Sequence, residues 1–232
     1  MTPYWLRRVS TVAPSDPHQV NPVLDRRAPD GFTVRPAAVL VLFGGSSEPD
    51  PLARGGLPAD ADVLLTQRAP TMRQHSGQIA FPGGAADPED DGPIATALRE
   101  AQEETGLDPA GVRPLTVLPE IFIPPSGFDV TPVVAFWEKP TPIGVVDPRE
   151  AARVVRVSLH DLLDPDNRFQ IRHEHGYQGP AFLVDDMLVW GFTAGILAGL
   201  FAVSGWEIAW DHTDIRDFEV TLAEIETGVV EP

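Results

Sequence analysis

The sequence predicts an α/β fold, because short apolar segments with strand character are interspersed with segments of helical periodicity. Strands are expected at residues 34–43 and 62–68, and an amphipathic helix is expected at residues 93–105. A chain of 232 residues can bury a substantial core and favours one elaborated domain over two. We therefore expect an N-terminal extension over residues 1–33 that packs on the core, and a single domain over residues 34–232 that includes the C-terminal helices.

Composition limits the function classes open to the chain. A net charge of −17 argues against a nucleic-acid polymer as partner, since no surplus of cations is available to neutralise phosphates. A small phosphorylated ligand needs only local positive charge, from a metal ion or a few arginines. The absence of cysteine excludes disulfides and thiolate catalysis. Together with the lack of a signal-peptide pattern in residues 1–10, it leads us to expect a cytoplasmic protein.

The remaining elements follow from the same patterns in chain order. Residues 4–9 can form a short helix, and residues 169–184 favour a β-hairpin around the turn at residues 176–180. Residues 217–226 are expected to form the last helix. Further strands are expected at residues 112–118, 121–123, 130–138 and 154–158.

Residues 187–206 contain no charged side chain and are long enough to span a bilayer. Acidic residues bracket this segment, and neither end has the basic flank that orients a membrane span. We therefore expect a buried helix over residues 186–203 and no membrane association.

The helix at residues 93–105 has well-defined ends. Residues 90–92 can cap its start, Pro93 suits the first turn, and Gly106 can adopt the left-handed conformation that ends a helix. One narrow apolar stripe is expected to be its buried face, formed by Ile94, Ala97, Leu98, Ala101 and Thr105.

Three glutamates lie on a neighbouring face of this helix. Glu100, Glu103 and Glu104 are spaced i, i+3 and i+4, so their carboxylates are close enough to repel. At roughly 6 Å and an effective dielectric constant of about 20, the repulsion is on the order of 3 kcal/mol per pair. The helix macrodipole also disfavours anions near its C-terminus. A bound divalent cation would reverse both effects, and the alternative is a solvated acidic face.

The paired glycines Gly83 and Gly84 come after a short apolar segment at residues 79–81. Glycines at such a position allow the backbone to approach a metal ion or a phosphate closely. The alternative is an ordinary turn at the end of a strand.

Residues 99–107 (REAQEETGL), together with Gly84 and the acidic residues between them, resemble the Nudix box of the Nudix hydrolases. The chain has one residue more than the family pattern between the glycine and Arg99. The counterpart of the first box glutamate is therefore open among Glu89, Asp90 and Asp91.

This resemblance implies a fold and a metal site. The fold is a mixed β-sheet sandwiched between helices (α/β/α). The metal is Mg²⁺ or Mn²⁺, held by Glu100, Glu103 and Glu104 with a carbonyl oxygen at Gly84. The resemblance also implies that Arg99 pairs with an acid of the preceding loop and has no need to contact substrate.

A second resemblance points to the substrate. Residues 64–84 (LLTQRAPTMRQHSGQIAFPGG) look like the signature upstream of the box in coenzyme A pyrophosphatases, and residues 126–132 and 190–194 are similar to the same subfamily. This implies hydrolysis of coenzyme A or its derivatives to 3′,5′-ADP and 4′-phosphopantetheine. Alternatives are another nucleoside diphosphate derivative, such as ADP-ribose or a dinucleoside polyphosphate, and a nucleotide-sensing module without turnover.

The resemblance assigns catalysis to Glu100, Glu103 and Glu104, with the general base open between Glu100 and Glu103. The residues expected to contact substrate are Arg68, Arg73, His75 and Phe128. The arginines could instead form loop salt bridges, the histidine could order its loop, and the phenylalanine could pack in the core. We expect a small-molecule substrate, with a homodimer as the candidate assembly.

Overall fold

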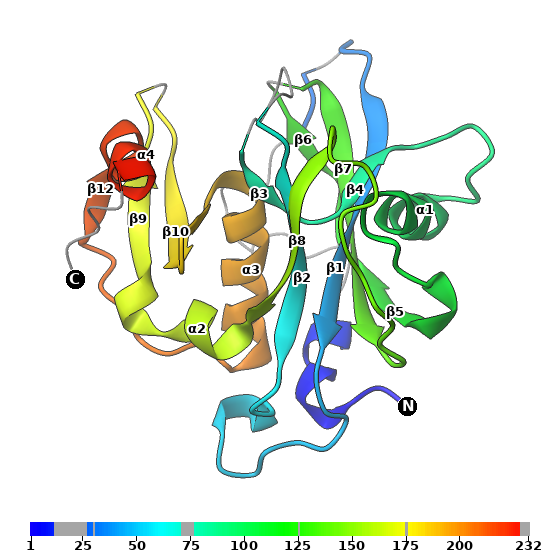
Figure 1. Ribbon diagram of the computed structural model, residues 1–232, viewed down its shortest axis with the longest axis horizontal. Coiled ribbons are helices and arrows are strands. Elements are labelled where there is room, and N and C mark those ends of the chain that lie inside the picture. The colour runs from blue at the N-terminus through cyan, green and yellow to red at the C-terminus, as the bar shows by residue number, and fades with distance from the viewer. Residues whose placement is uncertain (12–26, 30, 71–76, 125, 175, 228–232) are drawn as a thin grey trace.

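The computed structural model describes residues 1–11, 27–29, 31–70, 77–124, 126–174 and 176–227. Its centre is a mixed eight-stranded sheet with helix α1 on one face and helix α3 on the other (Figure 1). This arrangement confirms the expected α/β/α sandwich.

The central sheet is organised around β1 (Arg35–Gly44) and β7 (Phe128–Trp137), which run parallel in its interior. Both strands are long apolar runs, as expected for strands that are buried on both faces. The strand order is β3-β2-β1-β7-β5, with β4 paired to β1, β6 to β7 and β8 to β2. The other strands are β2 (Asp62–Arg68), β3 (Ile79–Ala80), β4 (Gly83–Ala85), β5 (Val112–Val117), β6 (Ile121–Ile123) and β8 (Ala151–Ser158).

Alternate side chains of β1 serve two different cores. Val41 and Phe43 belong to the core beneath α3, whereas Leu40 and Leu42 belong to the core beneath α1. This follows from the two-residue period of a strand, which sends successive side chains to opposite faces.

Helix α1 (Pro93–Thr105) has the predicted bounds, and Gly106 ends it in the left-handed conformation at φ 72°. Ala97, Ala101 and Thr105 are buried, as the predicted stripe requires. Ile94 is 38% exposed, so its place in the buried stripe was wrong. The fully buried part of the helix begins at Thr96 and Ala97, and the first turn contributes little to the core.

Helix α3 (Gly191–Ser204) begins five residues later than expected, because β11 (Met187–Val189) occupies the start of the apolar segment. Gly191 has φ 64°, a conformation that suits glycine at the junction between strand and helix. The helix lies between the two sheets, and its side chains are apolar all round for that reason. In the described parts of the chain, no helix is long and apolar enough to cross a membrane.

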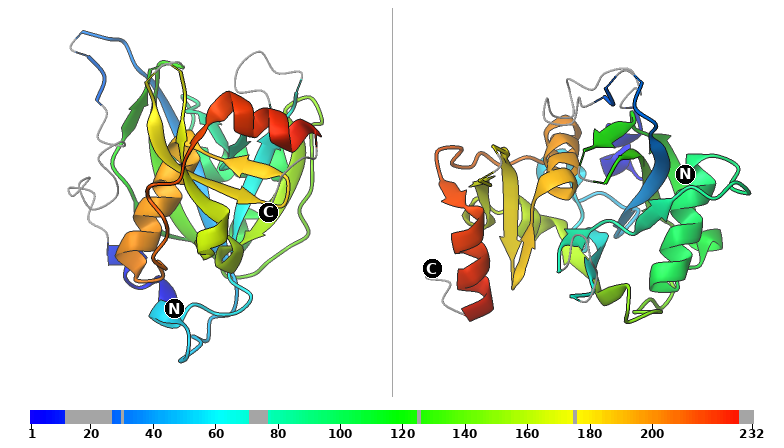
Figure 2. Two further views of the ribbon diagram at one scale, coloured as in Figure 1. Left: turned by 90° about the vertical axis from the view of Figure 1, so that its left-hand side faces the viewer. Right: turned by 90° about the horizontal axis from the view of Figure 1, so that it is seen from above.

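A second sheet of order β11-β10-β9-β12 packs beyond α3, and α4 (Phe218–Thr227) covers its outer side (Figure 2). The expected hairpin is present as β9 (Arg168–Arg172) and β10 (Gln178–Val184). Its extension into a separate sheet was not expected. The added strand β12 (Ile215–Asp217) has three residues and is mostly polar, so its pattern carries no strand signal.

The N-terminal residues form two 3-10 turns, η1 (Tyr4–Leu6) and η2 (Val9–Thr11), where a short helix was expected. Trp5, Leu6 and Val9 are buried in the core beneath α3, where the Trp5 ring lies 5.5 Å from that of Trp206. The short elements that complete the fold are η5 (Arg54–Gly56), η6 (Pro109–Gly111), α2 (Leu159–Leu163) and η7 (Pro165–Asn167).

Candidate active site

The paired glycines lie where β4 meets α1, wedged between the helix and β1. The Gly83 N–H donates a hydrogen bond of 3.2 Å to Oε2 of Glu104. A Cβ atom on Gly84 would lie 2.5 Å from Oε2 of Glu100, and a Cβ on Gly83 would clash with the carbonyl oxygen of Ala38. Only glycine allows the backbone to approach the glutamates this closely.

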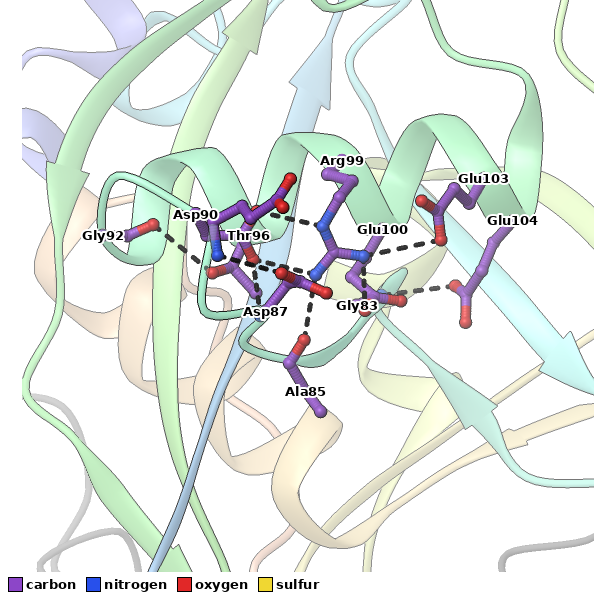
Figure 3. A network of polar contacts seen from close by, with 11 residues as sticks. Gly83, Ala85, Asp87, Asp90, Gly92, Thr96, Arg99, Glu100, Glu103 and Glu104 are labelled. Carbon is purple, nitrogen blue, oxygen red and sulfur yellow. Dashed lines mark hydrogen bonds and ion pairs between the residues drawn. The ribbon is translucent and has the colours of Figure 1, made fainter.

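Arg99 is surrounded by acceptors (Figure 3). Its Nε and Nη2 donate to the two carboxylate oxygens of Asp90 at 3.0 and 2.9 Å, and Nη2 also donates to the Ala85 carbonyl at 2.9 Å. Its Nη1 donates to Glu100 at 2.9 Å and contacts Glu103 at 3.5 Å. The predicted pairing of Arg99 with an acid of the preceding loop is confirmed, and the acid is Asp90.

Asp90 also closes its own loop. Its carboxylate accepts from the Asp87 N–H at 2.9 Å, and its backbone N–H donates to the Asp87 carbonyl. The adjacent Arg99 guanidinium and the Asp87 N–H hold the pKa of Asp90 well below its usual range. Asp90 is therefore the acid of this loop that is bound to α1, through Arg99. The N-cap residue of α1 is Gly92, and no side chain caps the helix there.

The three predicted glutamates lie on one face of α1 but make different contacts (Figure 3). Glu100 and Glu103 share Nη1 of Arg99, while Glu104 is turned toward the Gly83 N–H. In this arrangement no three acidic or histidine side chains of the described residues converge on one point as a metal cage. The donor set nevertheless consists only of oxygens, from the carboxylates and the nearby backbone of Gly83 and Gly84, and oxygen ligands are those that Mg²⁺ and Mn²⁺ prefer.

Burial raises the pKa of two of these carboxyls. The pKa of Glu104 rises to about 7, chiefly through desolvation, with the charges of Glu100 and Glu150 adding to the effect. The Gly83 N–H and the charge of Arg68 act in the opposite direction. The pKa of Glu100 is also raised by burial, despite its contact with Arg99. A cation at this face would favour the ionised form of both groups.

Sequence reasoning missed Glu150, which precedes β8. Its carboxylate lies near enough to raise the pKa of both Glu100 and Glu104. Its carbonyl accepts a 2.8 Å hydrogen bond from the Ala69 N–H, so the backbone of this residue is tied to the end of β2. No motif surrounds this glutamate, and only the pairing of β2 with β8 brings it to the site.

Two of the predicted substrate contacts, Arg73 and His75, lie outside the described residues. Arg68 ends β2, and its charge lowers the pKa of Glu104, which places its guanidinium near the glutamates. Its backbone exchanges hydrogen bonds with Gln78 and Gly77. Arg68 is thus close to the carboxylate face.

Phe128 lies in a strand, whereas the sequence predicted that this strand begins only at residue 130. It is the first residue of β7, because parallel pairing with Arg35 begins the strand there. The Arg35 guanidinium lies 4.2 Å from the centre of the Phe128 ring, within the range of a cation–π contact.

Comparison with known proteins agrees with this geometry. Residues 49–178 match the sequence model of the NUDIX domain. An uncharacterized Nudix hydrolase NudL of Cronobacter sakazakii is 39% identical over 169 residues, which cover 72% of this chain and 81% of that protein. A NudL of Klebsiella pneumoniae is 37% identical over 175 residues, with the same coverage.

Among solved structures, a Nudix hydrolase from M. smegmatis, RenU, has a TM-score of 0.38 and 28% identity, covering 53% of this chain and 70% of that one. This likeness is too limited to carry an argument by itself. The matched domain and the sequence relatives are sufficient, and the chain therefore belongs to the Nudix hydrolase family, whose members act on the phosphoanhydride bond of a diphosphate substrate.

Proposed function

We propose that this chain hydrolyses the diphosphate bond of coenzyme A or its derivatives, with a divalent metal ion, to 3′,5′-ADP and 4′-phosphopantetheine. The observation that carries the proposal is the packing of the α1 glutamates against the backbone of Gly83 and Gly84. The choice of coenzyme A is supported by the resemblance of residues 64–84 to the coenzyme A pyrophosphatases.

In this proposal Glu100, Glu103 and Glu104 hold Mg²⁺ or Mn²⁺, and the Gly84 carbonyl supplies a further oxygen. When bound, such an ion acidifies a coordinated water and offsets the negative charge of the diphosphate. The glutamates keep the ion at the C-terminal half of α1, where the free carboxylates otherwise repel one another.

The same carboxylates move the proton. Glu100 or Glu103 accepts a proton from the attacking water as its oxygen bonds to one phosphorus. The bridging P–O bond on the far side of that phosphorus breaks, and the leaving phosphate keeps the electron pair. Glu150 is a further carboxylate beside this face, and its charge influences the protonation of Glu100 and Glu104.

The substrate contacts are proposed on chemical grounds. Arg68 and Arg73 hold phosphate oxygens, because a guanidinium can donate two parallel hydrogen bonds to them. His75 and Phe128 are the other proposed contacts. Phe128 is the first residue of β7 and packs against Arg35, so a packing role fits it as well as substrate contact does.

A substrate panel tests the proposal. The purified full-length chain is assayed with Mg²⁺ or Mn²⁺ against coenzyme A, ADP-ribose and a dinucleoside polyphosphate, with products identified by mass spectrometry. We expect the highest kcat/KM for coenzyme A and no turnover with excess EDTA. A tenfold or greater preference for ADP-ribose would contradict the choice of substrate and leave the reaction type intact.

A nucleotide-sensing module is the alternative from another class. It predicts saturable ligand binding without product, and no functional loss in Glu103→Gln or Glu104→Gln. Turnover of any substrate on the panel that is lost in Glu104→Gln would exclude it.

A further inference from the structure

A cavity of about 340 Å³ lies away from the α1 glutamates, between η1, η5 and the C-terminal end of α3. Three arginines line it, Arg7, Arg8 and Arg54, together with the ring of Tyr4. Its position follows from β1. Gly84 pairs with Ala38 near the start of that strand, whereas the segment that carries Arg54 follows Gly44 at its end.

The cavity is therefore separate from the candidate active site. Six residues of strand between Ala38 and Gly44 correspond to about 20 Å. Figure 1 shows the same separation, with the N-terminus and the segment before β2 at one end of the sheet and β3 and β4 toward the other. Most of the residues that line the cavity also lie outside the segment that matches the NUDIX domain: Tyr4, Trp5, Arg7, Arg8, Ser204 and Gly205.

The charge of these arginines is not balanced locally. Within the described residues, no carboxylate forms a salt bridge with Arg7, Arg8 or Arg54. The chain carries 34 acidic residues against 17 basic ones, so a cluster of three arginines without acidic partners departs from its general charge balance. Clustered like charges are disfavoured unless something of opposite charge accompanies them.

Their observed contacts are with neutral groups and leave donors unused. The Arg7 guanidinium lies 5.3 Å from the centre of the Tyr4 ring. Arg54 Nη1 donates a 3.1 Å hydrogen bond to the Glu207 carbonyl. A Cβ atom on Gly205 would lie 2.7 Å from Nη1 of Arg8, which places that guanidinium over the end of α3. Each guanidinium has five N–H donors, so most remain open to a ligand.

The Trp206 indole lies behind one wall of the cavity, beneath Gly55. Trp206 is 1% exposed, and its Nε1 has no hydrogen-bond partner among the described residues. The cavity-lining residue Gly55 lies directly against it, since a Cβ atom there would be 3.1 Å from Nε1. A buried donor without an acceptor is unfavourable. The indole is buried behind this wall, so the donors open to a ligand in the cavity are those of the exposed side chains of Arg7, Arg8 and Arg54.

We propose that this cavity, which we call the arginine pocket, binds the phosphate group of a small metabolite at a second site. Arginine suits phosphate because its planar guanidinium matches two phosphate oxygens. The volume is at the lower end of the range for small-molecule sites and suits a phosphate ester. The competing interpretation is that Arg8 and Arg54 only stabilise the segment after α3, which they contact at Gly205 and Glu207.

Calorimetric titration of the full-length protein with inorganic pyrophosphate tests this proposal. EDTA is present so that the α1 glutamates bind no metal and repel the probe. We expect saturable binding that weakens at least tenfold in Arg7→Gln/Arg8→Gln, two substitutions at exposed positions. Binding should also weaken as NaCl is raised, because the contacts are ionic.

Arg153→Gln is the matched control, since it removes a cation of β8 that already pairs with Asp186. Arg68→Gln tests whether the probe instead occupies the candidate active site. The proposal is overturned if wild-type protein binds no pyrophosphate, if the double variant binds it unchanged, or if only Arg68→Gln weakens binding. If wild type binds no pyrophosphate and the double variant loses thermal stability, these arginines have a purely structural role.

Discussion

Arg99 and the arginines of the arginine pocket are the same residue type in opposite surroundings. Arg99 contacts three carboxylates and a backbone carbonyl, and the contacts with Asp90 and Glu100 raise its pKa. Arg7 and Arg8 have no salt bridge to any described carboxylate. The difference separates two uses of arginine. Arg99 has its hydrogen-bonding capacity filled by the protein and is suited to hold a loop against α1, whereas unfilled donors are available to a ligand.

The same contrast applies to the acids. Asp90 pairs with Arg99, and its pKa is lowered. Glu104 is buried and forms no salt bridge with any described residue, and its pKa is raised. A buried carboxylate whose negative charge is not paired with a side-chain cation is the one expected to bind a metal ion.

The largest effect is expected for Glu104→Gln. Removing this charge weakens the hold on the metal that carries the chemistry, so kcat should fall by at least on the order of 10²-fold. Steady-state kinetics with coenzyme A and Mg²⁺ measure it. Glu219→Gln, at an exposed position of α4, is the control and should retain full activity. A loss below about fivefold in Glu104→Gln would mean that the metal site is elsewhere.

Glu104 should also make the metal-free protein less stable at high pH. Its pKa is raised from its ordinary value to about 7 in the folded state, so its contribution is fully present below pH 4 and is lost as pH rises through 7. Denaturant unfolding in EDTA should show Glu104→Gln gaining on the order of 2 kcal/mol over wild type between pH 5 and pH 8. Glu103→Gln serves as comparison, and a pH-independent difference for Glu104→Gln would contradict the assigned burial.

Asp90→Asn should release Arg99 from the loop. The freed guanidinium can then turn fully to Glu100 and Glu103 and compete with the metal, so we expect kcat/KM to fall about tenfold. Melting temperatures should fall more than in Asp147→Asn, which breaks an exposed pair with Arg149. Raising the metal concentration should restore part of the lost activity. If Asp90→Asn has the same kcat/KM as wild type, the pairing of Asp90 with Arg99 has no functional consequence.

The smallest effect is expected for Arg73→Ala. Loss of a phosphate contact should raise KM about fivefold and leave kcat within about twofold. Arg113→Ala removes an arginine paired with Glu138 and is the matched control. If kcat collapses while KM is unchanged, Arg73 acts in the chemical step and not in binding.

Local patterns were sufficient to predict α1 and most strands of the central sheet, and the resemblance to the Nudix box implied the pairing of Arg99 with a loop acid. The i, i+3, i+4 spacing and the glycine after the helix are local signals, and the residues involved are close in sequence. The start of α3 was not predictable in the same way, because an apolar segment of 20 residues has no periodicity that separates β11 from the helix.

Long-range pairing explains what the sequence could not reveal. Glu150 reaches the site because β8 pairs with β2. Asp90 is distinguished from Glu89 and Asp91 by its contacts with Arg99 and with the Asp87 N–H. The arginine pocket joins residues separated by about two hundred positions, and no motif marks it.

The most direct test of the account is whether the α1 glutamates hold a divalent ion. Mn²⁺ is titrated into the full-length protein, and the free ion is followed by electron paramagnetic resonance. Wild type should bind Mn²⁺ saturably, and Glu103→Gln/Glu104→Gln should bind it at least tenfold more weakly. Glu219→Gln/Glu224→Gln on α4 removes the same charge and should behave as wild type. Equal Mn²⁺ affinity in both double variants would contradict a metal site on α1.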